Sequence, residues 1–144
     1  MVFSTKNREP LLVSKEVRRE VFRHIKQNAE QKEIRLDCIN GYHDHAHCLI
    51  SLNKEQNISK TSQLIKGESS FWINKNNVIK DNFSWQDDYW AVSVSESHVQ
   101  SVREYIKNQE ELHKKVSITD EVNEFTDVEM NKKLIDGKKQ MDNK

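Results

Sequence analysis

Two neighbouring stretches with strand-like patterning constrain the fold of this chain more than any other feature of its sequence. Apolar and charged residues alternate over residues 33–42, and a period of two is typical of a strand with one buried face. Residues 45–52 form a second such stretch, and the short separation favours an antiparallel pair. On the first strand, one face is expected to carry Ile34, Leu36, Cys38 and Asn40, and the other Arg35, Asp37 and Ile39.

Helical periodicity and turn signals place the remaining elements around this pair. Ser14 is a suitable helix cap, and apolar residues follow it at helical spacing. We expect a short strand over residues 1–5, helices over 14–31, from 57 to about 76, and over 95–113, and a third full strand over 83–94. This order is typical of an α+β fold of the split βαβ, or ferredoxin-like, type, a sandwich with helices on one face of an antiparallel sheet.

The chain has 144 residues, which fits one domain. We expect this domain to span residues 1–115, because the sequence beyond Lys115 is charged and nearly free of aromatic residues. Residues 116–144 are predicted to form a C-terminal helix or tail that is partly disordered.

Composition excludes a membrane-spanning protein and favours the cytoplasm. No apolar run approaches the roughly 20 residues of a membrane span, and the N-terminus lacks the apolar core of a signal peptide. The two cysteines, Cys38 and Cys48, do not form a C-x-x-C pair. We therefore expect both to be small buried strand residues in a reducing compartment.

Charge does not decide whether the chain binds nucleic acid. The formal net charge is zero, which argues weakly against DNA as a partner. However, residues 1–80 carry 14 basic against 9 acidic residues, and residues 81–144 carry 9 basic against 14 acidic residues. The basic N-terminal half can therefore still present a basic face.

The most informative segment contains three histidines within five residues, His43, His45 and His47. On a strand, His45 and His47 share one face while Ala46 points into the core. Two imidazoles held side by side can ligate one metal ion. A structural zinc site is the alternative, but it would need four nitrogen or sulfur ligands, and Cys48 points to the opposite face from His47.

A second candidate segment lies in the last expected helix. Tyr105 and Gln109 are four residues apart, and are therefore neighbours on one helical face. By itself, this spacing is more typical of a structural tyrosine at the margin of an apolar stripe.

Taken together and in order, these motifs resemble the single-tyrosine HUH transposases of the insertion sequence 200/605 family, which are related to the REP-associated tyrosine transposases. His45-Ala46-His47 has the His-hydrophobic-His form that names HUH nucleases, and Tyr105 with Gln109 is similar to the family's tyrosine helix. The resemblance extends over residues 1 to about 115. It is carried further by residues 3–8, 44–47, 85–89 and 102–106.

The resemblance implies a metal-dependent enzyme that cleaves and rejoins single-stranded DNA at hairpin-marked element ends through a covalent 5′-phosphotyrosine intermediate. Tyr105 would be the nucleophile, while His45, His47 and Gln109 would hold the metal. Two imidazoles and an amide oxygen with open positions suit Mg²⁺ or Mn²⁺. The resemblance also implies a homodimer, in which the tyrosine helix of one subunit can serve the histidines of the other.

Basic and polar residues near the first strand and on the second helix are candidates for DNA contacts. Backbone N–H groups, a lysine and hydroxyls at the start of the second helix can hold a phosphate. The candidate DNA-binding residues are Lys6, Arg8, Lys60, Thr61 and Lys66. Phe71 and Trp72 could stack on unpaired bases, but packing against the sheet is the commoner role for such side chains.

Two other functions are compatible with the sequence. The first strand opens at Met1-Val2-Phe3, several residues later than in the family, which suggests an inactive or domesticated hairpin-binding protein on the same fold. The other is a small protein with a structural zinc ion, which would unfold when the zinc is chelated.

Overall fold

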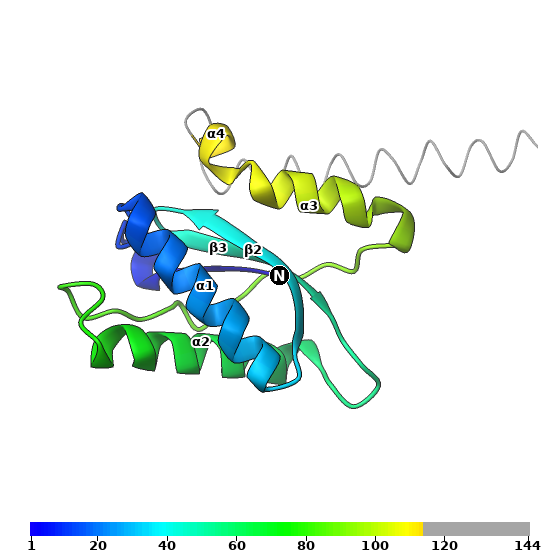
Figure 1. Ribbon diagram of the computed structural model, residues 1–144, viewed down its shortest axis with the longest axis horizontal. Coiled ribbons are helices and arrows are strands. Elements are labelled where there is room, and N and C mark those ends of the chain that lie inside the picture. Colours follow the sequence, from blue (N-terminus) through cyan, green and yellow to red (C-terminus); the bar gives the residue numbers. More distant parts are fainter. Residues whose placement is uncertain (114–144) are drawn as a thin grey trace, which may run out of the picture. The chain divides into compact units, whose positions relative to one another are not determined.

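The computed structural model describes residues 1–113, and the chain divides into two units, residues 1–110 and 111–144. The predicted tail, residues 116–144, lies outside the described residues. None of the helices in the described part of the chain is both long and apolar enough to cross a membrane. The elements, shown in Figure 1, are β1 (Val2–Ser4), η1 (Lys6–Arg8), α1 (Lys15–Gln31), β2 (Arg35–Tyr42), β3 (His45–Ser51), α2 (Ile58–Lys75), η2 (Glu96–His98), α3 (Val99–Lys107) and α4 (Gln109–His113).

The sheet consists of three antiparallel strands in the order β1-β3-β2, which confirms the predicted α+β class and the β2–β3 hairpin. The hairpin closes with Tyr42 opposite His45. Gly41 is required just before this turn, because a Cβ atom there would overlap the backbone carbonyl oxygen of His45. β1 pairs with the other side of β3 and places Phe3 opposite Ala46.

The two faces of the sheet are covered by different helices. Phe3, Ala46 and Cys48 lie on one face, in the hydrophobic core. The helical residues of this core come from α1 and α2; they are Val21, Phe22, Ile25, Ala29, Ile65 and Ile73. The alternation of β3 turns His45 and His47 to the opposite face, where α3 contacts β2 and β3 (Figure 1). The sequence predicted that the helices lie on one face of the sheet. This is confirmed for α1 and α2, whereas α3 lies on the opposite face.

β2 departs from regular alternation at Asp37. The partners of Leu36 and Cys38 on β3 are consecutive residues, so Asp37 is an extra residue and forms a β-bulge. The bulge shifts the side chains that follow it to the opposite face. Cys38 and Asn40 therefore lie on the face covered by α3, and Ile39 lies on the core face. The predicted faces of these three residues were wrong for this reason.

Residues 83–94 do not form the predicted third full strand. They run beside β1 and make only isolated bridges, Val2 with Trp90 and Thr5 with Trp85. Between the two bridges, residues 3–4 lie opposite residues 86–89. The second segment therefore has two extra residues, and continuous strand pairing is interrupted there. The apolar pattern of this segment therefore reflects packing against the sheet rather than regular strand pairing.

The helix starts agree with the capping predictions. The side chains of Ser14 and Asn57 each accept a hydrogen bond from the backbone N–H three residues later, at the starts of α1 and α2. The predicted helix over residues 95–113 is divided into η2, α3 and α4, with a break at Asn108.

Both cysteines are free thiols. Burial raises the pKa of the Cys48 thiol to about 12, so this thiol is protonated at neutral pH. Cys38 is only partly buried, on the face covered by α3, so the prediction of a buried residue is confirmed for Cys48 alone.

Candidate active site

The candidate site lies on the face of β3 that α3 covers. His45 and His47 both project from this face, with Ala46 turned into the core between them. His45 is fully buried and His47 is 5% exposed. Their ring centroids are 5.1 Å apart, and their ligating nitrogens lie within 4.8 Å of one another. The two predicted histidines are therefore close enough to share one metal ion.

Gln109 approaches His45 from the first position of α4, which follows the tyrosine helix α3 after Asn108. Its side chain is fully buried, and its Oε1 lies 3.2 Å from Nε2 of His45. Its Nε2 donates a hydrogen bond to the backbone carbonyl oxygen of Tyr105 over 3.3 Å. This contact orients the amide so that the oxygen, rather than the nitrogen, faces the histidine.

Asp44 was not among the predicted site residues, but it contacts the other ring nitrogen of His45. Its Oδ1 lies 2.8 Å from Nδ1 of His45. The backbone carbonyl of Asp44 accepts from the backbone N–H and the hydroxyl of Thr5, over 2.8 and 3.2 Å, so the residue that follows β1 holds the turn in place. An acidic residue directly before the first histidine of the motif is the sequence signal that could have identified it.

The two contacts of His45 indicate what the site can bind. A neutral imidazole carries one N–H, yet the nitrogens of His45 face two oxygen acceptors, one from Asp44 and one from Gln109. If Nδ1–H donates to the carboxylate, Nε2 directs a lone pair toward the amide oxygen. A cation between Nε2 and Oε1 would satisfy both atoms, as in carboxylate–histidine–metal arrangements.

The separation of these two atoms also suits a small divalent ion. Adjacent ligands in an octahedron, each about 2.1 Å from Mg²⁺, lie about 3.0 Å apart. The 3.2 Å between Nε2 of His45 and Oε1 of Gln109 is close to that value. The donor set therefore fits a divalent cation in both its chemistry and its spacing.

Tyr105 completes the cluster from α3. Its ring centroid is 5.6 Å from that of His47, and the two rings are nearly perpendicular, at 81°. The side chain is partly exposed, whereas both histidines are buried. Val102 and Ile106 on the same helix are buried against the sheet. The phenol can thus meet a substrate that arrives from solvent while remaining beside the histidines.

Comparison with known proteins identifies the family. Residues 1–109, which include all four clustered residues, match the model of the family described as Transposase IS200 like. The chain belongs to the IS200-like transposase family. Among solved structures, the crystal structure of a putative transposase from Deinococcus radiodurans has the same fold, with a TM-score of 0.59 and 24% sequence identity over 75% of this chain and 86% of that chain. Among curated proteins, none matched the chain.

The five predicted DNA-binding residues of this transposase differ from one another in burial and in hydrogen bonding. Lys6, Arg8 and Lys60 are exposed. Thr61 is buried, so its hydroxyl does not lie at the surface. Lys66 donates to two carbonyl oxygens of the loop over residues 87–88, and burial lowers the pKa of its ammonium group. Lys66 therefore holds the loop beside β1, which is a structural role that the sequence did not indicate.

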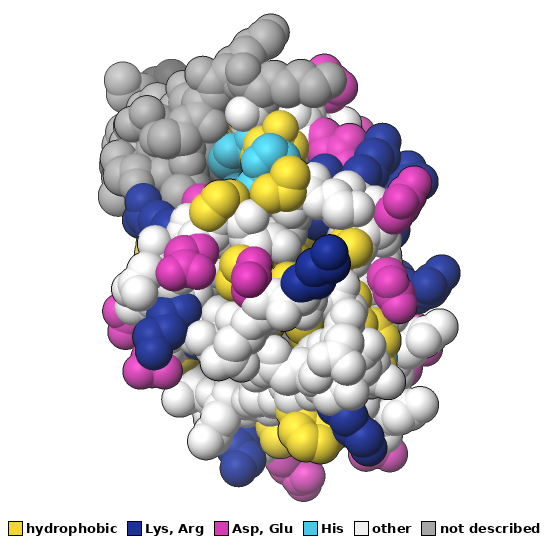
Figure 2. Space-filling view, turned by 90° about the vertical axis from the view of Figure 1, so that its left-hand side faces the viewer, with side chains coloured by type: hydrophobic (Ala, Val, Ile, Leu, Met, Phe, Trp, Pro, Cys, Tyr) yellow, Lys and Arg dark blue, Asp and Glu magenta, His cyan; other side chains and the backbone are white. Residues whose placement is uncertain are grey.

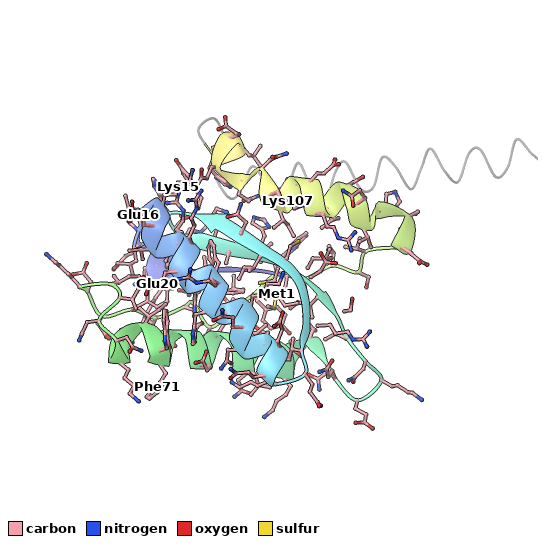
Figure 3. All side chains as sticks on the ribbon, in the orientation of Figure 1. Met1, Lys15, Glu16, Glu20, Phe71 and Lys107 are labelled. Carbon is pink, nitrogen blue, oxygen red and sulfur yellow. The ribbon has the colours of Figure 1, made fainter. Side chains whose placement is uncertain are left out.

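The two aromatic residues of α2 also differ from each other. Phe71 is 65% exposed and points away from the sheet on the outer side of α2 (Figure 3), so it is not the core residue that packing would predict. Trp72 is partly buried and stacks on His24 of α1, with ring centroids 3.9 Å apart.

Charge on the visible face of the molecule is mixed. Figure 2 shows acidic and basic side chains interspersed over most of this face, with histidines beside hydrophobic side chains at one end. This agrees with a net charge of zero. Affinity for DNA on this face would therefore depend on individual contacts rather than on a broad positive surface.

Proposed function

We propose that this transposase cleaves and rejoins single-stranded DNA through a covalent bond to Tyr105, with a divalent metal ion as cofactor. The observation that carries the proposal is the cluster itself: the ring of Tyr105 on α3 lies beside His47, and Gln109 at the start of α4 lies beside His45. A structural tyrosine would not require two buried histidines and a buried glutamine around it.

His45, His47 and Gln109 would hold the ion, with Asp44 orienting His45 through Nδ1. Three protein ligands would leave open positions, which phosphate oxygens of the substrate would fill on Mg²⁺ or Mn²⁺. When bound, the ion would neutralise charge on the scissile phosphate as it develops in the transition state. Cys48 is buried on the opposite face of β3, so it does not join the histidines in a structural zinc site.

The chemical step can be written with the residues of this chain. The phenolic oxygen of Tyr105 attacks phosphorus, the P–O3′ bond breaks, and the departing 3′ oxygen takes up a proton as the phenol loses one. The product is a 5′-phosphotyrosine ester together with a free 3′-hydroxyl. Because one phosphate ester replaces another, a second 3′-hydroxyl can reverse the step without a nucleotide cofactor.

The substrate and assembly belong to the same proposal. We propose that the DNA is a hairpin beside the gene, that the active form is a homodimer and that it acts in the cytoplasm. Lys6, Arg8 and Lys60 are the exposed candidates for phosphate contacts. Support for these points comes from the family to which the chain belongs.

The test uses end-labelled single-stranded DNA that carries the hairpin and flanks from beside the gene. The protein is mixed with this DNA and Mn²⁺ or Mg²⁺, and the products are separated on a denaturing gel. We expect a metal-dependent protein–DNA adduct that Tyr105→Phe abolishes. Tyr89→Phe is the matched control, since Tyr89 is a partly buried tyrosine of the core periphery, and it should still form the adduct.

An adduct that persists in Tyr105→Phe would refute the assigned nucleophile. If the unmodified chain binds the hairpin but forms no adduct under any condition, the inactive hairpin-binding protein becomes the better explanation.

A further inference from the structure

The helix that carries Tyr105 has few apolar contacts to hold it in position. α3 is nine residues long and has two buried residues, Val102 and Ile106. A helix of this length is not stable alone in water and takes its position from tertiary contacts. The alignment of Tyr105 and Gln109 with the histidines must therefore depend on further contacts between α3 and the rest of the first unit.

One such contact is an ion pair between α3 and the bulge of β2. Nε and Nη2 of Arg103 donate to Oδ1 and Oδ2 of Asp37, over 2.9 and 2.6 Å. Two parallel hydrogen bonds from a planar guanidinium fix both distance and orientation. The bulge places Asp37 for this contact, and Arg103 is two residues before Tyr105. Hydrogen bonding from Arg103 lowers the pKa of Asp37, so the carboxylate is charged at neutral pH.

A second ion pair lies on the other side of Tyr105. Nη2 of Arg18 donates to Oε1 of Glu110 over 3.0 Å, and Lys15 lies 3.2 Å from Oε2. Arg18 is itself fixed, because its Nη1 donates to the carbonyl oxygens of Leu12 and Val13. Glu110 directly follows Gln109, so this contact acts on the predicted metal ligand.

A neutral hydrogen bond joins the helix end to β2. Nδ2 of Asn40 donates to the carbonyl oxygen of Lys107 over 3.1 Å. Figure 3 shows Lys107 on α3, and Lys15 at the first turn of α1. Ties to β2 and to α1 thus flank the segment that contains Tyr105 and Gln109.

We propose that two ion pairs, Asp37–Arg103 and Arg18–Glu110, form a clasp that positions Tyr105 and Gln109 against the histidines of the same chain. These are positioning residues, since they act through the placement of α3 and of Gln109. The inference about catalysis rests on the proposed function, whereas the inference about the position of the helix does not. Releasing the Asp37–Arg103 pair loosens α3 locally and moves the nucleophile and a metal ligand together.

The test compares the full chain with Arg103→Gln, with Asp37→Asn, and with the exchanged pair Asp37→Arg/Arg103→Asp. Arg19→Gln is the control for Arg103→Gln, because Arg19 is exposed on α1 and both substitutions remove one positive charge. Hydrogen exchange is measured for the amides of residues 102–109 and for those of β3, and the Kd for Mn²⁺ is measured by titration.

We expect each single substitution to speed exchange over residues 102–109 by about two- to fivefold, the range for a partly exposed ion pair. Exchange in β3 should not change. The Kd for Mn²⁺ should rise by a similar factor, because the same segment carries Gln109. The exchanged pair should restore part of both properties, and Arg19→Gln should match the unmodified chain.

Unchanged exchange over residues 102–109 in both single variants would overturn the clasp. An equal increase throughout the domain would also overturn it, because the pair would then contribute only to global stability. If the unmodified chain neither binds Mn²⁺ nor cleaves DNA, the proposed function fails, while local exchange still decides whether the clasp exists.

Discussion

Removing the carboxylate of Asp44 is expected to weaken Mn²⁺ binding without unfolding the domain. Its Oδ1 lies 2.8 Å from Nδ1 of His45. A hydrogen bond to a charged group is worth about 1.5 to 3 kcal/mol. Loss of an outer partner of a ligating histidine typically weakens metal binding by about 10- to 100-fold, or roughly 1.4 to 2.8 kcal/mol. The two estimates agree, so we expect Asp44→Ala to raise the Kd for Mn²⁺ within that range.

The substitution Asp44→Asn tests the effect of charge alone, because it keeps the size of the side chain but removes its negative charge. The amide oxygen can still accept from Nδ1–H of His45, but it lacks the negative charge that favours this tautomer. If the amide instead presents its NH₂ group, Nδ1 must accept and Nε2 carries the proton, which blocks a metal ion. If the amide oxygen of Asp44→Asn faces His45, we expect its loss of affinity for Mn²⁺ to be smaller than that of Asp44→Ala. If the NH₂ group faces His45 instead, the loss should be as large as that of Asp44→Ala.

The assay is a Mn²⁺ titration followed by electron paramagnetic resonance, with urea unfolding as a check on the fold. Asp81→Asn is the control, since Asp81 is exposed and its substitution changes the net charge equally. If Asp44→Ala binds Mn²⁺ as tightly as the unmodified chain, the reasoning that Asp44 orients His45 as a ligand is refuted.

Two further predictions concern stability. Ser69→Ala should destabilise the domain by about 1 to 3 kcal/mol, because the buried Ser69 hydroxyl accepts from Nε1 of Trp85 over 2.8 Å and its loss leaves the indole N–H unsatisfied. Urea unfolding checks this, and Ser70→Ala, which removes only hydrogen bonding to two carbonyl oxygens of its own helix, should have little effect. The carboxyl of Asp37 has a pKa below its ordinary 3.8 in the folded chain because Arg103 donates to it. Its stabilising contribution should therefore be complete above that value and be lost as the pH falls through the lower, folded pKa. The urea midpoint of Arg103→Gln should differ from that of the unmodified chain at neutral pH and approach it as the pH falls below the folded pKa of Asp37; a constant difference across this range would contradict the assignment.

Much of the fold could be predicted because its signals are local. Ser14 and Asn57 start their helices as expected, since a cap acts on a backbone N–H three residues away. The β2–β3 hairpin follows from the alternation of two adjacent stretches. The expected strand over residues 83–94 failed because its apolar residues pack against the sheet while the pairing register slips by two residues between the bridges.

The candidate site also combines features that the local sequence predicts with features that depend on distant contacts. The spacing of His45 and His47 can be read directly because both lie on one strand, whereas Tyr105 on α3 and Gln109 on α4 lie on either side of the break at Asn108. The contact between the two pairs joins residues 64 positions apart, and local periodicity carries no information on such a distance. Thr61 and Lys66 had suitable chemistry for DNA, but burial and a loop contact gave them other surroundings.

By itself, the sequence determined the β2–β3 hairpin, the starts of α1 and α2, the histidine pair and the tyrosine–glutamine spacing, because these depend on neighbours within a few residues. Only the tertiary structure decided that Asp37 is a bulge residue that meets Arg103, that α3 covers the face opposite α1 and α2, and that Asp44 and Gln109 contact opposite nitrogens of His45. These features depend on strand register and on contacts between distant segments, which form only when the whole domain packs.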